Sequence, residues 1–240
     1  MKHIFQTLAR MIVHRESKVI LQQLITRTYA NQRSLILRCD LHEPQREITA
    51  KIPLNLRLLR EKDLPSIIRE RPRRLPLLLE KIPTCYVAFT SAGEPAYINW
   101  VVFNTDWERF SPYFAGRLHK ELESNECVFE FAYTFEKFRG LGVMGAALRM
   151  IIAEIAHERP HVRWGYTYIL DKNIPSLKGC RNAGFQPYMQ REEHWRALHM
   201  RQVFSSIDCG KGFPFEDGSP PIRFDQSGST KALSNTRLPS

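Results

Sequence analysis

The sequence has 240 residues, a formal net charge of +10 and an isoelectric point near 9.6, and 43% of its residues are hydrophobic. This length and composition suffice for the core of one sizeable domain, which excludes a chain that is disordered throughout. The basic surface should attract anions such as nucleic acid, anionic lipid or a polyphosphate cofactor, but charge alone does not choose among them.

Cysteine usage and hydrophobicity indicate the cellular compartment of the protein. The five cysteines are scattered, odd in number and form no C-x-x-C pair, so neither a disulfide framework nor a zinc site is expected. No apolar run is long enough to span a bilayer, and the N-terminus lacks the apolar core of a signal peptide. We therefore expect a cytoplasmic protein without a metal.

Residues 2–28 are predicted to form a basic amphipathic helix. Ile4, Leu8 and Ile12 recur at helical spacing, and lysine and arginine far outnumber the single acid, Glu16. Such a helix can lie on an anionic membrane surface, or it can pack on its own domain or on a partner subunit. We divide the chain into an N-terminal extension at 1–45, a main domain at 46–207 and a flexible tail at 208–240, where hydrophobic periodicity is lost.

The middle of the chain alternates strand and helix patterns. Strands are predicted at 34–40, 54–59, 85–90, 95–103, 127–134 and 162–170, followed by a closing hairpin at 185–196 and 198–207. Helices are predicted from about 64 and at 75–81, 114–123, 146–157 and 175–183. Residues 91–94 supply a hairpin turn between the two clearest strands.

A glycine-rich turn precedes the helix at 146–157. It runs Phe138-Arg139-Gly140-Leu141-Gly142-Val143-Met144-Gly145. A turn that opens directly into a helix can present backbone N–H groups and the positive end of the helix dipole to a phosphate. With Arg139 at its mouth, it predicts binding of a phosphorylated cofactor; the alternative is a strand-to-helix turn without a ligand.

Two motifs in order give the chain a family resemblance. The first, Arg139 to Met144, is similar to the pattern Q/R-x-x-G-x-G/A, and the second comprises Asn173-Ile174-Pro175-Ser176-Leu177 and then Ala183-Gly184-Phe185. Together they resemble the GNAT superfamily of CoA-dependent N-acyltransferases, loosely over 55–205 and well over 127–190. The chain departs from the pattern at Met144, where a small residue is usual; Gly145 follows one place later, which indicates a shifted or widened loop.

The resemblance implies a mixed α+β (α/β) fold whose central, mostly antiparallel sheet splays at a V-shaped cofactor cleft and is flanked by helices. It implies acetyl-CoA or another acyl-CoA as co-substrate, with the pantetheine arm between the strands at 127–134 and 162–170. A backbone N–H of the earlier strand could polarise the thioester carbonyl. Arg139 either holds phosphate or braces the loop. The implied cofactor-binding residues are Phe135, Arg139, Gly140, Leu141, Gly142, Val143, Met144, Gly145, Asn173 and Ser176.

Attack of an amine on a thioester needs a base, and the departing thiolate takes up a proton. In many members of the superfamily a tyrosine seven places after the asparagine of the second motif donates that proton, and Cys180 stands at this place. A thiol has a suitable ordinary pKa, but cysteine is also a common buried filler. Tyr166, Tyr168 and Tyr188 are alternative acids, and a thiolate can leave without one. Glu130 is the candidate base, unless it is only an exposed or ion-paired strand carboxylate.

The candidate catalytic residues are therefore Glu130, Cys180 and Tyr168. The leading hypothesis is an N-acyltransferase, most simply an N-acetyltransferase, in which a primary amine attacks acyl-CoA directly. The alternatives are a longer-chain enzyme that uses acyl-CoA or an acyl carrier protein in cell-envelope metabolism, and a non-catalytic CoA-binding protein.

The partners follow from charge and from the resemblance. Residues 1–30 could contact the inner membrane surface or an acidic carrier protein, and a homodimer is left open. Nucleic acid is not expected, because no recognition motif accompanies the charge. The segments 60–82, 104–126 and 186–198 are expected to set the specificity for the amine acceptor.

Overall fold

The computed structural model describes residues 29–44, 47–70, 84–114, 120–196, 199–207 and 213. The helices predicted at 2–28 and 75–81 lie outside these residues, and so does the predicted tail at 208–240 except for Phe213. The side chain of Phe213 is buried in the core.

One eight-stranded sheet runs through the described residues in the order β2-β3-β4-β5-β6-β1-β7-β8. The strands are Tyr29–Asp40 (β1), Leu54–Leu58 (β2), Cys85–Thr90 (β3), Pro95–Phe103 (β4), Glu126–Thr134 (β5), Trp164–Leu170 (β6), Gln186–Arg196 (β7) and His199–Ser206 (β8). Neighbouring strands are antiparallel except β5 and β6, which are parallel. The mixed, mostly antiparallel sheet confirms the predicted fold class.

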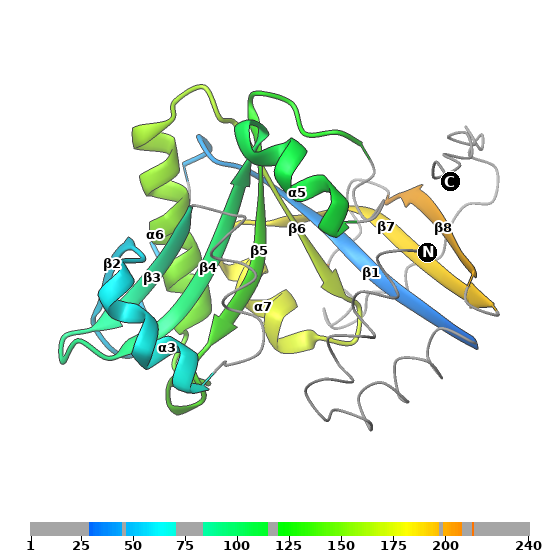
Figure 1. Cartoon of the computed structure of the whole chain (residues 1–240). Helices are drawn as coiled ribbons and strands as arrows, with labels where there is room; N and C mark the ends of the chain where they lie inside the picture. Colours follow the sequence, from blue (N-terminus) through cyan, green and yellow to red (C-terminus); the bar gives the residue numbers. More distant parts are fainter. Residues whose placement is uncertain are drawn as a thin grey trace.

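Helices cover both faces of the sheet (Figure 1). They are Leu64–Glu70 (α3), Trp107–Phe114 (α5), Val143–Glu158 (α6) and Ile174–Asn182 (α7), with short 3-10 turns at Glu61–Asp63, Asn104–Asp106 and Glu136–Phe138. In Figure 1, α3 and α5 lie in front of the sheet and α6 lies behind it. The strands β3 and β4 are buried along almost their whole length, because they have cover on both faces.

The helix predicted at 114–123 differs from the structure where the two can be compared. The helix α5 ends at Phe114 and residues 120–125 are not helical, whereas residues 115–119 of the prediction lie outside the described residues. This earlier position buries Phe110, whose ring meets that of Phe131 edge-on at 6.2 Å. A contact between residues so far apart in sequence is invisible to a reading of local periodicity.

The strand predicted at 34–40 begins earlier, at Tyr29, and is an inner strand of the sheet. Residues 34–40 pair with β6, and the other edge of β1 pairs with β7. Leu35, Ile36 and Leu37 are buried in the core. The division at 1–45, 46–207 and 208–240 stays a prediction, although β1 shares its sheet with the main domain.

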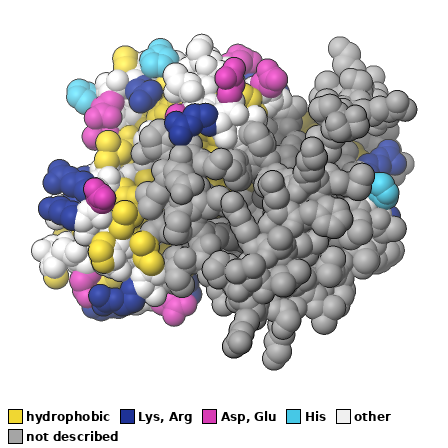
Figure 2. Space-filling view, viewed as in Figure 1, with side chains coloured by type: hydrophobic (Ala, Val, Ile, Leu, Met, Phe, Trp, Pro, Cys, Tyr) yellow, Lys and Arg dark blue, Asp and Glu magenta, His cyan; other side chains and the backbone are white. Residues whose placement is uncertain are grey.

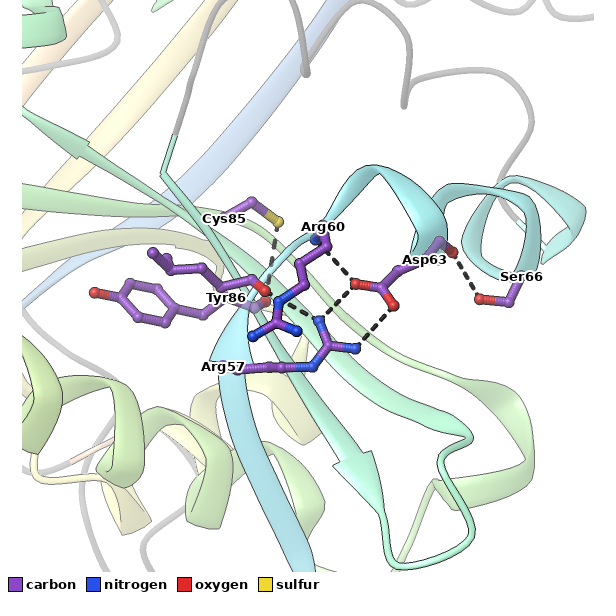
Figure 3. Close-up of polar contacts among 7 residues, drawn as sticks. Arg57, Arg60, Asp63, Ser66, Cys85 and Tyr86 are labelled. Carbon is purple, nitrogen blue, oxygen red and sulfur yellow. Dashed lines mark hydrogen bonds and ion pairs between the residues drawn. The ribbon is translucent and has the colours of Figure 1, made fainter.

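A charged pair fixes the connection from β2 to α3 (Figure 3). Arg57 donates two hydrogen bonds to the Asp63 carboxylate, at 2.6 and 2.8 Å, and its guanidinium lies 4.1 Å from the ring centroid of Phe89. The Arg60 amide also donates to Asp63, and the Ser66 hydroxyl donates to the Asp63 carbonyl. The hydrogen bond from Arg57 holds the pKa of Asp63 below its ordinary value, so the pair is charged at neutral pH.

Candidate functional site

The strands β5 and β6 are paired at one end only. Residues 126–128 lie opposite 164–166, and beyond them the two strands separate (Figure 1). A cavity of about 410 Å³ opens at this split, a volume typical of ligand pockets. The predicted V-shaped cleft is therefore present.

A buried carboxylate closes the paired end of the split. The Tyr166 hydroxyl donates to Glu126 at 2.9 Å, and the Lys120 ammonium lies 2.6 Å from the same oxygen. Burial raises the pKa of Glu126, but the hydrogen bonds from Lys120, the Glu123 amide and Tyr166 outweigh burial and lower it. A charged, fully bonded carboxylate thus joins β5 to β6 where their ladder ends.

A bulge in β5 lies where the strands part. Phe131 has φ 56°, in the left-handed region that is costly for a residue with a side chain. On β4, Asn99 alone stands opposite Phe131 and Ala132, so the register shifts there. Edge-on ring contacts with Trp100 and Phe110 hold Phe131 in this conformation. Such a bulge takes backbone groups out of the ladder beside the cavity.

The glycine turn leads directly into α6. Gly140 and Gly142 have φ 76° and 75°, which favour glycine, and Gly142 is the N-cap residue of the helix. The first four amides of an α-helix have no acceptor inside the helix. The turn therefore presents an N–H cluster at the positive end of the helix dipole, as predicted from the sequence.

One wall of this turn comes from residues 49–51, which sequence reasoning missed. The Lys51 amide donates to the Leu141 carbonyl at 2.9 Å. A methyl group on Gly142 would lie 3.7 Å from the Ala50 Cα and from the Thr49 carbonyl oxygen. The bond engages a carbonyl of the turn rather than an amide, and it brings the exposed Lys51 to the turn.

Arg139 braces the turn. Its Nε donates to the Thr134 carbonyl at 3.2 Å, its Nη1 lies 3.3 Å from Glu136, and its guanidinium is 5.4 Å from the ring centroid of Tyr133. Of the two roles predicted for Arg139, this geometry favours bracing. Phe135 is buried, so its side chain anchors the strand end in the core.

Val143 and Gly145 are buried in α6, whereas Met144 lines the cavity. A Cβ on Gly145 would lie 3.2 Å from the Asn182 Cβ, and one on Gly179 would lie 2.6 Å from the Met144 sulfur. The two glycines thus allow close packing of α6 on α7. The glycine one place beyond the motif has a packing role besides its place in the first helical turn.

Asn173 and Ser176 lie together at the start of α7. The Asn173 side-chain oxygen accepts from the Ser176 amide at 3.4 Å, which caps the helix, and both residues line the cavity. The second motif therefore contributes a wall of the same cavity that Met144 of the first motif lines.

Glu130, Tyr168 and Cys180 line this one cavity from β5, β6 and α7. Burial raises the pKa of both Cys180 and Tyr168. A free thiol has a pKa near 8.5, so neither group is a stronger acid than the thiol that a thioester would release. The structure thus favours Cys180 as a buried filler and leaves the half-buried Glu130 as the candidate base.

Sequence reasoning also missed a buried charged pair in the cavity wall. Arg191 Nη2 lies 3.0 Å from Glu193 and donates to the Ser34 hydroxyl at 3.2 Å. The Arg191 and Glu193 side chains are each 8% exposed, although both line the cavity together with Asn99. Arg191 and Glu193 are two places apart on a predicted strand, so the sequence already indicated that they share a face of the sheet. That this face borders the cavity became clear only when β1 was found to pair with β7.

The contact predicted for residues 1–30 with a membrane or a carrier protein lies almost wholly outside the described residues. On the described part of the face in Figure 2, basic side chains are interspersed with acidic and hydrophobic ones. Among the described residues, no group of three histidine, cysteine or acidic side chains is placed to hold a metal ion. None of the helices in the described ranges combines the length and hydrophobicity needed to cross a bilayer.

No profile of a known protein family and no curated protein matches this sequence. Solved structures do match it. A GCN5-related N-acetyltransferase from Sphaerobacter thermophilus is 12% identical, with a TM-score of 0.50 over 79% of this chain and 58% of that one. An acetyltransferase of the GNAT family from Colwellia psychrerythraea is 10% identical, with a TM-score of 0.47 over 70% of this chain and 57% of that one.

AAC(6′)-Ib, solved in complex with paromomycin and acetyl-CoA, is 17% identical, with a TM-score of 0.44 over 63% of this chain and 90% of that one. The chain spans little more than half of the Sphaerobacter and Colwellia structures, at 58% and 57% of their lengths. At such low identities the likeness concerns architecture. With the split sheet and the glycine turn at the head of α6, the similarity to the Sphaerobacter structure shows that this chain has the GNAT fold.

Proposed function

We propose that this protein is an N-acyltransferase that moves an acyl group, most simply acetyl, from acyl-CoA to a primary amine. One observation carries the proposal: the cavity at the split between β5 and β6 is lined both by Glu130 and by Met144, which lies in the first turn of α6 directly after the glycine turn. The start of α6, where the amides of the turn would hold phosphate, and the Glu130 carboxylate thus meet at one cavity.

The residues around the split fit a CoA thioester. The turn from Gly140 to Gly145 would hold the pyrophosphate through its amides, since two of its glycines lie at positive φ and lack a Cβ. The exposed Lys51 adds a cation beside the turn. Backbone groups of β5 and β6 beyond their last pair would bind the pantetheine arm. When bound, the thioester supplies the activated acyl group.

The chain's own residues would then act on the amine. Glu130 would take the proton that the attacking nitrogen loses as its lone pair forms the C–N bond. The C–S bond breaks, and its electron pair leaves on sulfur as thiolate. Backbone N–H groups of the β5 bulge would stabilise the negative charge that develops on the carbonyl oxygen.

Cofactor binding can be tested with two matched glycine variants. Gly140 and Gly93 both have positive φ, and a Cβ on either would have no neighbour within 4 Å, so Gly140→Glu and Gly93→Glu carry similar backbone strain. Only Gly140 lies on the proposed cradle. By calorimetry we expect Gly140→Glu to weaken CoA binding by about tenfold or more, and Gly93→Glu to leave it unchanged. Equal affinities in both variants would refute the cradle.

Turnover decides between the enzyme and a non-catalytic CoA-binding protein. Thiol release from acetyl-CoA in the presence of a panel of amines supports the enzyme, and binding without turnover supports the alternative. The same assay with longer acyl-CoA thioesters tests the longer-chain hypothesis. Contact of residues 1–30 with a membrane remains a prediction, for which sedimentation with anionic vesicles should be weaker for a chain lacking these residues.

A further inference from the structure

The two faces of the sheet give the cavity two different halves. The Phe129 ring packs on Phe185 at 5.4 Å, on the side of α7. Because side chains alternate along a strand, its neighbour Glu130 points to the opposite face. Tyr168 lies on that face too, because Tyr166, two places earlier on β6, bonds Glu126, four places before Glu130 on β5. The Arg191 guanidinium is 5.7 Å from the Tyr168 ring centroid, so Arg191 lies on the same face.

The half behind the sheet is mainly apolar and borders the proposed cofactor site. Phe129, Met144, Leu148 and Cys180 line it, close to the start of α6. The half in front of the sheet lies on the far side of the split from the glycine turn. An acceptor that attacks a thioester seated in the split would therefore approach from the front half.

The front half carries three charged side chains. Glu130, Arg191 and Glu193 line it, and the last two form an ion pair at 3.0 Å. The Ser34 hydroxyl accepts a hydrogen bond from Arg191. The contacts with Glu193 and Ser34 both involve Nη2, and they hold the guanidinium in the cavity wall.

The charges select among amine acceptors. A hydrophobic amine would cover the Arg191–Glu193 pair with hydrocarbon, which is costly for buried charges. A diamine would bring a second cation towards Arg191. An amine that also carries a carboxylate meets both signs of charge, because guanidinium binds carboxylate well and the two glutamates suit an ammonium group.

We propose that the acceptor is an amine bearing a carboxylate, of which free amino acids are the simplest, with its carboxylate on Arg191 and its amine between Glu130 and Glu193. This inference rests on the proposed acyl transfer and adds the substrate class. It makes Arg191 and Glu193 the residues that determine acceptor specificity.

Matched acceptors provide the first test. With acetyl-CoA as donor, the standard amino acids are screened by thiol release, and the best is compared with its primary amide and its decarboxylated amine. We expect kcat/KM to be about tenfold or more higher for the amino acid than for either analogue, because each analogue lacks the group that Arg191 binds. Equal values for the three compounds would overturn the inference.

Variants of the pair provide the second test. Arg191→Gln alone would leave Glu193 buried without its cation, so the double variant Arg191→Gln/Glu193→Gln is used, which keeps polar side chains of similar size. We expect it to lose the preference for the amino acid over its amide, through a higher KM, while CoA affinity is unchanged. Glu192→Gln is the matched control, since Glu192 lies between the two on β7 and contacts Arg33 and Gln190 on the other face.

The outcomes separate this inference from the proposed function. Calorimetry of the amino acid in the presence of plain CoA, which cannot react, should show binding to the wild type and not to the double variant. If CoA binds and simple amines are acetylated but no amino acid is preferred, the inference falls and the acyltransferase stands. If neither CoA nor acetyl-CoA binds, the proposed function fails and the inference fails with it.

Discussion

The two edges of β6 behave in opposite ways. On one edge, residues 164–170 pair with β1 along the whole strand, and on the other, pairing with β5 stops at Tyr166. The pairing of β6 with β1, which we call the closed seam, includes the buried residues Leu35 and Leu37. The edge of β6 that faces β5 opens into the cavity. A strand that is fully held on one side can thus leave the backbone groups of its other edge to a ligand.

The difference between the two edges of β6 also shows which backbone groups make the site energetically costly. Unpaired backbone groups at a buried edge are costly unless water or a ligand satisfies them. The split is tolerated because Glu126 joins β5 to β6 at its closed end and because β1 holds β6 in place. We therefore expect the edge of β6 that pairs with β1 to contribute to stability and the edge that faces β5 to contribute to binding. Substitutions can test this division.

The largest expected effect is on chemistry at the open edge. Glu130→Gln keeps the shape of the side chain but cannot take a proton, so we expect kcat to fall by about 10²–10⁴-fold with acetyl-CoA affinity and melting temperature nearly unchanged. Glu154→Gln, on the exposed side of α6, is the control. A Glu130→Gln enzyme with wild-type kcat would remove Glu130 as the base.

At the closed seam the expected effect is on stability. The Leu37 side chain is fully buried in β1, and Leu37→Ala should lower the free energy of unfolding by about 2–5 kcal/mol. Leu58→Ala, at a side chain that is 47% exposed, should change it by less than about 0.5 kcal/mol. Urea denaturation measures both, and similar small losses would show that the seam with β1 is not part of the stable core.

The closed end of the split should respond to pH. Glu126→Gln removes the charged acceptor of Lys120 and should cost about 1–3 kcal/mol at neutral pH. The pKa of Glu126 in the folded protein is below its ordinary value of 4.5, so this stabilisation is present above pH 4.5 and is lost as the pH falls through the folded pKa.

The wild-type and Glu126→Gln proteins should therefore converge in stability in acid. Unfolding curves across this range measure the convergence. Glu123→Gln, at a side chain that is 65% exposed and also contacts Lys120, should show a much smaller difference. A constant difference between wild type and Glu126→Gln at all pH values would contradict the role given to the charge.

The smallest effect is expected at Cys180. Cys180→Ala should leave kcat/KM close to the wild-type value and cost about 1 kcal/mol of stability, because burial makes this thiol a weak acid and it fills space. Cys39→Ala is a suitable control, since Cys39 is buried in β1 and burial raises its pKa to about 12. A tenfold or larger fall in kcat for Cys180→Ala alone would restore it as the proton donor.

Features with local causes were predictable from the sequence. The hairpin at 91–94 and the glycine turn appear where they were expected, and α7, at Ile174–Asn182, lies within one residue of the helix predicted at 175–183. Each depends on a turn, cap or helical stripe within a few residues. Met144 of the first motif and Asn173 and Ser176 of the second line one cavity, because a strand–turn–helix–strand unit keeps its ends close in space.

The sequence by itself determined these local elements and the two motifs, since turn chemistry and periodicity act over short distances. Only the tertiary structure decided that β1 enters the sheet between β6 and β7, that β5 bulges at Phe131, and that Arg191 and Glu193 face the cavity. Pairing between strands joins residues far apart in the chain, and the register of such pairing sets which side chains meet.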